Sequence, residues 1–162
     1  MSYTDFRVIT EVNTDSSIVS KLLMGKLSLF QTQEKIRDFF LGGSTRFGWA
    51  THTSDVDVFV LADLRLSHIK ELDLSPAPSP TSYQLGWPHY QTFINGIKID
   101  FLVTFDEETF HALRIEHMAI ERLLASNPGF LVLIKGNKMR GPKLYRTLAS
   151  IVNIKEHETP IP

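Results

Sequence analysis

The stretch SDVDVFVL, at residues 54–61, sets two aspartates into a run that is otherwise apolar and rich in β-branched residues. Such a run is typical of a buried β-strand. Residues two apart on a strand project to the same face, so Asp55 and Asp57 are predicted to lie side by side while Val56 and Val58 turn to the other face. The segment therefore predicts a core strand that carries a pair of carboxylates.

A third acid, Asp100, interrupts the apolar run from Ile97 to Val103, and an adjacent strand would bring it against the first pair. An unpaired charge in a dry interior costs on the order of several kcal/mol, so such a cluster needs cations. A divalent ion meets that need, because Mg²⁺ prefers oxygen ligands and shares its shell with phosphates. The alternative is structural: Asp55 caps the strand start, and Asp100 pairs with Lys98 or lies on an edge strand.

A glycine-rich turn, from Gly42 to Gly48, follows the apolar residues 39–41 and precedes the acids. A turn of small residues lets backbone amides and a hydroxyl approach phosphate oxygens closely. It matches neither a Walker loop nor a dinucleotide fingerprint. A tight connection between two elements is the plainer interpretation of the turn alone.

The order of these segments resembles the nucleotidyltransferase superfamily of DNA polymerase beta, particularly its minimal members. In that family a strand ends in Gly-Ser or Gly-Gly, a loop and short helix follow, and an acid-hydrophobic-acid pair opens the next strand. Here ten residues, 45–54, separate Ser44 from Asp55, and the resemblance covers about Phe39 to Val103. Minimal members often read Gly-Ser-Arg-x-Arg-Gly, whereas this chain has Thr45 and Phe47 at the arginine positions.

The resemblance implies a metal-dependent nucleotidyltransferase that moves a nucleoside monophosphate from a nucleoside triphosphate, ATP by default, to a hydroxyl or phosphate. The acceptor would be a protein, a small molecule or an RNA end. Two Mg²⁺ or Mn²⁺ ions about 3.5 to 4 Å apart would polarise the α-phosphate and stabilise the departing pyrophosphate. The residues to which the resemblance assigns metal binding and catalysis are Asp55, Asp57 and Asp100, the last completing the inner metal site and acting as base.

Phosphate binding is assigned to Gly43 and Ser44, with Arg46 and the basic residues Lys135, Lys138 and Arg140 as further candidates. These last three belong to residues 135–146, which contain five lysines or arginines and no acid. Such a stretch neutralises a triphosphate or tracks a polynucleotide, or it is only a solvated loop and helix side. Two other functions therefore stay open: a non-catalytic nucleotide-binding or antitoxin-like partner protein, and a nucleic-acid-binding module that uses the basic stretch.

The remaining pattern predicts a single α/β (α+β) domain over residues 1–155, with a mixed, largely antiparallel sheet and flanking helices. Its core would span 15–105, its C-terminal helical part 107–152, and a loose tail 156–162. Asn95-Gly96 predicts a hairpin. Helices are predicted from residue 15 or 16 to about Leu29, over 32–37, from Glu107 to Ser126, and from Pro142 to about Val152, and a short apolar segment over 130–134. In the first helix, the predicted inward residues are Ile18, Leu22 and Leu29.

Composition narrows the class of protein further. A chain of 162 residues with 43% hydrophobic positions suits one domain, and the absence of cysteine excludes disulfides and thiolate metal sites. The six histidines lack zinc-site spacing, and the segment from Trp87 to Tyr90 either lines a base pocket or packs on the core. The net charge of -1 gives no global attraction to nucleic acid. With no signal-peptide pattern and no spanning run, we expect a cytoplasmic protein without a membrane partner.

Overall fold

A five-stranded mixed sheet forms the centre of the protein, in a computed structural model that describes residues 16–48, 54–63, 66–77, 85–129 and 142–158. The strand order is β1-β2-β5-β4-β3, with β1 at Asp38–Gly42, β2 at Val56–Leu61, β3 at Ser75–Pro76, β4 at His89–Ile94 and β5 at Ile97–Thr104. Only β2 and β5 pair in parallel; the other neighbours are antiparallel. The predicted mixed, largely antiparallel sheet with flanking helices is confirmed.

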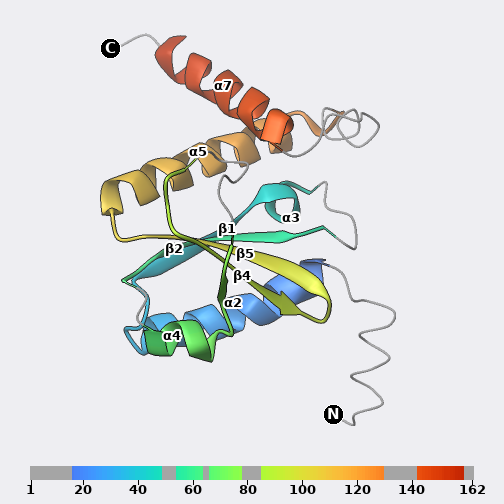
Figure 1. Cartoon of the computed structure of the whole chain (residues 1–162). Coiled ribbons are helices and arrows are strands. Elements are labelled where there is room, and N and C mark those ends of the chain that lie inside the picture. Colours follow the sequence, from blue (N-terminus) through green and yellow to red (C-terminus); the bar gives the residue numbers. More distant parts are fainter. Residues whose placement is uncertain (1–15, 49–53, 64–65, 78–84, 130–141, 159–162) are drawn as a thin grey trace.

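Helices cover both faces of this sheet (Figure 1). On one side lie α2 (Ser16–Thr32) and the short α4 (Leu66–Glu71), and on the other α5 (Glu107–Ser126), with α7 (Pro142–Glu158) packed over it. The five-residue helix α3 (Gly43–Phe47) follows β1 directly. The sheet is therefore the middle layer, and its two faces meet different partners.

Alternation along β2 and β5 sorts their side chains between two apolar clusters. Val56, Val58 and Val60 belong to a cluster with Ile99, Phe101 and the buried side of α2. The intervening residues Phe59, Leu61 and Leu102 join Phe40 and Phe110 of α5 on the other face. A third cluster joins α5, α7 and Phe47 of α3. The period of two predicted for β2 is thus what separates the two faces.

The Asn95-Gly96 hairpin is confirmed between β4 and β5. Asn95 has φ 52° and Gly96 has φ 81°, so both turn residues are in the left-handed region. A two-residue turn of this kind matches the right-handed twist of the flanking strands. It fixes the register, with Ile94 opposite Ile97 and Gln91 opposite Asp100.

The two C-terminal helices begin where the sequence predicts them. The carboxylate of Asp106 caps α5 by accepting from the backbone N–H groups of Glu108 and Thr109. Helix α7 starts at Pro142 but continues to Glu158, beyond the predicted end at Val152. Residues 156–158, predicted as the start of a loose tail, are therefore helical. The apolar segment expected at 130–134 lies outside the described residues.

The N-terminal helix differs from its prediction in extent and in orientation. Its buried apolar residues are Val19, Leu23, Leu27 and Phe30. The side chains predicted inward include Leu22 and Leu29, which are 50% and 54% exposed. The helix has apolar side chains on two sides. The side that packs against the sheet is the one on which Val19, Leu23 and Leu27 follow one another at intervals of four residues. That choice depends on the sheet surface it meets.

The helix predicted over 32–37 is absent because α2 ends in a left-handed turn there. Glu34 has φ 58°, and the N–H of Lys35 donates to the carbonyl of Phe30 over 2.9 Å. This six-residue loop closes the last helical carbonyls in a Schellman motif without glycine. The chain then enters β1 at Asp38.

Two short elements, α4 and β3, were not predicted. β3 lies at the start of the stretch SPAPSP, residues 75–80, and pairs with β4 at the edge of the sheet, where proline is tolerated. Among the described helices, none combines the length and apolar character needed to cross a membrane.

Candidate functional site

Asp57 and Asp100 are direct neighbours across the parallel β2–β5 pair. Paired residues of adjacent strands share a face, so both carboxylates lie on the α5 side of the sheet. Asp55 comes two residues before Asp57, at the entry to β2, and Gly42 at the end of β1 pairs with Asp57 on its other side. The structure thus places the three predicted acids and the glycine turn at one end of one face.

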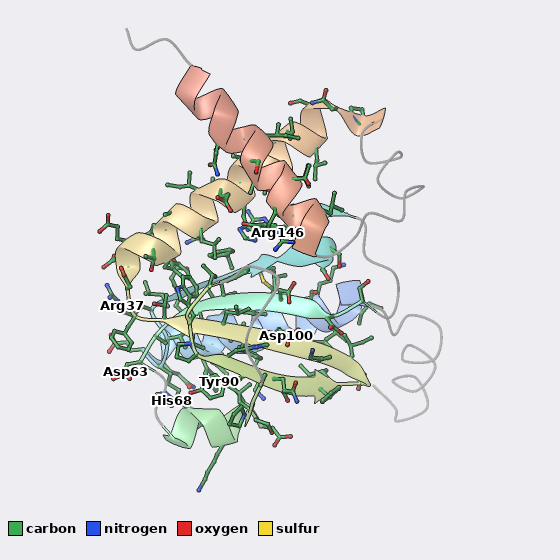
Figure 2. All side chains as sticks on the ribbon, turned by 45° about the horizontal axis from the view of Figure 1, so that its top comes forward. Arg37, Asp63, His68, Tyr90, Asp100 and Arg146 are labelled. Atoms are coloured by element: carbon green, nitrogen blue, oxygen red, sulfur yellow. The ribbon has the colours of Figure 1, made fainter. Side chains whose placement is uncertain are left out.

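Asp100 is held far more deeply than Asp55. The side chain of Asp100 is 11% exposed and that of Asp55 is 51% exposed. Because β5 lies between β2 and β4, Asp100 is not on an edge strand, which removes one structural alternative for this residue (Figure 2). A charge so placed needs partners.

Lys98 is the first of those partners, and it bridges two of the acids. Its Nζ lies 3.4 Å from Oδ1 of Asp100 and 3.7 Å from Oδ2 of Asp55. Partial burial lowers the pKa of the Lys98 ammonium, but attraction to Asp100 and Asp55 outweighs burial, and the net pKa is raised above its ordinary value. A permanent positive charge therefore lies between the strand entry and the buried acid.

His89 of β4 is the second partner of Asp100. Its Nε2 lies 2.8 Å from the same Oδ1 atom, and the His89 side chain is 8% exposed. An ionised carboxylate only accepts, so the Nε2–H donates this hydrogen bond. His89 belongs to the segment predicted to line a base pocket or to pack; Trp87 of that segment packs edge-on against Phe59.

The clustered carboxylate oxygens of Asp55, Asp57 and Asp100 are ligands of the kind that a hard cation such as Mg²⁺ prefers. Their arrangement is not that of a preformed cage: in the part of the chain that the structure describes, no three His, Asp or Glu side chains converge closely enough to hold one ion. The cation that does lie between Asp55 and Asp100 is the Lys98 ammonium. A metal ion would share or take that place.

The turn after β1 needs glycine at two positions for different reasons. Gly43 has φ 65°, which disfavours residues with a Cβ. A Cβ on Gly42 would lie 2.5 Å from Cε2 of Phe59 and 2.7 Å from Nε2 of His117, so packing excludes it. The turn sets Gly43 and Ser44 at the start of α3, directly after the residue opposite Asp57.

Arg46, a candidate phosphate ligand, is engaged elsewhere. Its guanidinium donates to the carbonyl of Leu41 over 2.9 Å and pairs with Glu121 of α5 over 3.1 Å. The side chain is only 15% exposed. These contacts brace α3 between β1 and α5, and phosphate binding by Arg46 would require them to open. Lys135, Lys138 and Arg140 lie outside the described residues.

His117 fills the space behind the turn. It is fully buried, its Nδ1–H donates to the carbonyl of Leu113 over 2.9 Å, and its ring stacks on Phe47. Burial, with a smaller contribution from Arg46, lowers the pKa of His117 to about 4. Near it, the Tyr145 hydroxyl donates to Glu116, and burial raises the pKa of that hydroxyl. This group supports the turn, because His117 packs against the space beside Gly42.

Sequence reasoning named Lys98 only as a structural partner of Asp100 and did not place His89. Both positions follow from period-two alternation. Lys98 is two residues before Asp100 on one strand, and the hairpin register that pairs Gln91 with Asp100 puts His89 on the same face. The sequence of the hairpin alone was therefore sufficient to predict that His89 and Lys98 lie on the same face as Asp100.

Comparison with solved structures finds the crystal structure of conserved protein GrpB from Enterococcus faecalis. It is 13% identical, the match covers 89% of this chain and 97% of that chain, and the TM-score is 0.50. No model of a known protein family and no curated protein matches the sequence. This likeness shows the fold alone, and the mixed α+β sheet with its flanking helices is consistent with a nucleotidyltransferase-like fold.

Proposed function

We propose that this protein is a metal-dependent nucleotidyltransferase that moves a nucleoside monophosphate from a nucleoside triphosphate to a hydroxyl or phosphate. The observation that carries the proposal is the pairing of Asp57 with Asp100 across β2 and β5, with Gly42 on the other side of Asp57. The fold supports it, because a nucleotidyltransferase-like sheet presents its acids at this place. The acids and the glycine turn belong to β1, β2 and β5 or lie directly beside them, and these strands are separated along the sequence.

The roles of the residues follow from their positions. Asp55 and Asp57 would hold Mg²⁺ or Mn²⁺, which when bound supplies charge to stabilise the phosphoryl group under attack and the leaving pyrophosphate. Gly43 and Ser44 would approach the phosphates through backbone amides and a hydroxyl. Asp100, hydrogen-bonded to His89 and paired with Lys98, would complete the ligand set and accept the acceptor's proton. Catalysis of this kind is mostly positioning and electrostatics.

The decisive experiment is calorimetric titration of non-hydrolysable analogues of each nucleoside triphosphate, with and without Mg²⁺. We expect one nucleotide to bind only with metal, and Asp55→Ala/Asp57→Ala to weaken that binding by more than about 100-fold, because both metal ligands are lost. Asp63→Ala is the matched control: this exposed acid follows the other end of β2 (Figure 2). Absence of any nucleotide binding in Mg²⁺ or Mn²⁺ contradicts the proposal.

A non-catalytic nucleotide-binding partner protein is the second candidate, and one observation favours it. The most buried acid, Asp100, is already satisfied by His89 and Lys98 within the chain. Such a protein would bind nucleotide without turning it over. Release of pyrophosphate from the bound triphosphate, assayed with protein, RNA and small-molecule acceptors, separates the two functions.

A further inference from the structure

We propose that Lys98 is the built-in counter-ion of the acid cluster: it competes with free metal ions for Asp55 and Asp100, so that the site accepts metal together with a triphosphate rather than metal alone. The inference rests on the proposed function and adds a specificity-determining residue to it. It concerns the positive charge of Lys98, whose Nζ lies 3.7 Å from Oδ2 of Asp55.

The geometry gives Lys98 the place that a first cation would occupy. Its Nζ is within 4 Å of two carboxylates, that of Asp100 on β5 and that of Asp55 just before β2. In the described residues, no third ligand joins these carboxylates in an arrangement that would hold a metal ion. A tethered ammonium is present at a constant, high effective concentration, whereas a free ion must be bound from solution. Any ion that takes both carboxylates has to displace it.

The strength of that competition can be set from the distances. Unit charges about 4 Å apart interact strongly enough to alter binding by roughly one power of ten in bulk water and up to about three near a protein surface. Removing the ammonium should therefore strengthen binding of a free divalent ion by about tenfold or more. A chain that merely used Lys98 to hold the strands together would lose metal binding instead, because its carboxylates would separate.

A triphosphate changes the balance because it gives the displaced ammonium a new partner. The Lys98 side chain is 35% exposed and has a flexible four-carbon stem, so it can turn outward without unfolding β5. Phosphate oxygens carried in with the metal would then accept from its Nζ. The same residue thus opposes free metal and favours the metal–nucleotide complex.

The test compares Mn²⁺ binding without nucleotide, followed by electron paramagnetic resonance of the free ion, in wild type, Lys98→Met, Lys98→Arg and Lys35→Met. Lys35 is the matched control, since it also pairs with one carboxylate, Glu71, over 2.8 Å, outside the acid cluster. We expect Lys98→Met to bind Mn²⁺ about tenfold more tightly than wild type, and Lys98→Arg and Lys35→Met to match wild type. Binding of the Mn²⁺–nucleotide analogue should weaken in Lys98→Met alone.

A second readout needs no nucleotide and no activity. In EDTA, Lys98→Met should unfold at a lower temperature than wild type, because Asp100 and Asp55 lose a positive neighbour, and Mn²⁺ should restore it. Lys98→Gln repeats the test with a polar side chain of similar length. Unchanged or weaker Mn²⁺ binding in both neutral variants overturns the inference.

The outcomes separate this inference from the proposed function. In one outcome, wild type binds nucleotide in a metal-dependent way, and Lys98→Met has the same nucleotide affinity and the same Mn²⁺ affinity as wild type. That result supports the transferase proposal and excludes the role of Lys98. Tighter Mn²⁺ binding by Lys98→Met, with no nucleotide bound by wild type, keeps the counter-ion and removes the transferase. Failure of every form to bind metal removes both.

Discussion

The two faces of the β2–β5 pair are built from the same strands but differ in what their side chains do. Toward α2, Val56, Val58, Ile99 and Phe101 are each at most 1% exposed and wholly apolar. Toward α5, the face is apolar only in its far half, and Asp57 and Asp100 occupy the near half. One face has no polar group to satisfy, while the other gathers acids, Lys98 and His89 at one end.

This difference shows how one strand can serve stability and chemistry together. A period of two lets each strand give one side entirely to the core while the other carries charges, so the costly groups never interrupt the packing with α2. Substitutions on the α2 face should therefore change the free energy of unfolding. Substitutions at the acid end should change binding instead.

The largest loss of stability is expected for Phe101→Ala. The ring is fully buried in the α2-side cluster, and its removal leaves a cavity that neighbours close only in part. We expect a loss of about 3–5 kcal/mol in the free energy of unfolding measured with urea. Phe93→Ala is the control on the adjacent strand, where the ring is 61% exposed, and it should change stability by less than about 0.5 kcal/mol. Equal losses would contradict the assignment of the core face.

The next effect is a pH dependence from His117, on the α5 side. Its folded pKa of about 4 is lowered from 6.5 by burial, with Arg46 opposing the charge, so between these values the unfolded chain binds more protons. Stability from this group is present above pH 6.5 and is lost as pH falls toward 4, by roughly 3 kcal/mol in all. Urea unfolding between pH 4 and pH 7.5 measures it. The pH dependence of His117→Gln should be shallower over that window by this amount, and an identical curve would refute the prediction.

Gly42→Ala tests the packing between the turn and His117. The added methyl group would lie 2.5 Å from Phe59 and 2.7 Å from His117, both rigid buried rings, so we expect a loss of about 1–3 kcal/mol. Gly25→Ala in α2 is the matched control, because nothing lies within 4 Å of its added methyl group and alanine favours a helix. A gain of roughly 1 kcal/mol is expected there. Thermal unfolding of the pair distinguishes the two, and two gains would show that the turn can relax.

The acid end of the sheet could be predicted because it depends on alternation within each strand. Asp55, Asp57 and Asp100 stand out against apolar neighbours, and the Asn-Gly turn fixes how β4 meets β5. The parallel pairing of β2 with β5 is different, since it joins residues more than 40 positions apart and depends on how the whole chain folds. The sequence indicated that the acids should meet; only the register shows Asp57 opposite Asp100.

What the sequence did not predict depends on competition between nearly equal local choices. Helix α2 has two apolar sides, and the side with Val19, Leu23 and Leu27 packs against the sheet. Arg46 looked available to phosphate because its partner, Glu121, is distant in sequence and lies on α5. Lys98 was visible as a partner of Asp100, but its reach to Asp55 depends on the pairing of two strands. Local patterns predicted elements better than they predicted partners.

The smallest change in stability is expected for Asp57→Asn. Its comparison with Val58→Asn tests most directly the difference between the two faces. The two positions are adjacent, and each variant introduces the same side chain. At position 57 the change removes one negative charge next to Asp100, so the free energy of unfolding should shift by less than about 1 kcal/mol while metal-dependent nucleotide binding is lost. At position 58 the amide enters an apolar cluster with no exposure, which costs about 2–4 kcal/mol. Urea unfolding and calorimetry on the same samples measure both effects. If Asp57→Asn lowers the free energy of unfolding as much as Val58→Asn does, the carboxylate of Asp57 stabilises the fold. That result would contradict the assignment of the acid end of the sheet as a binding site.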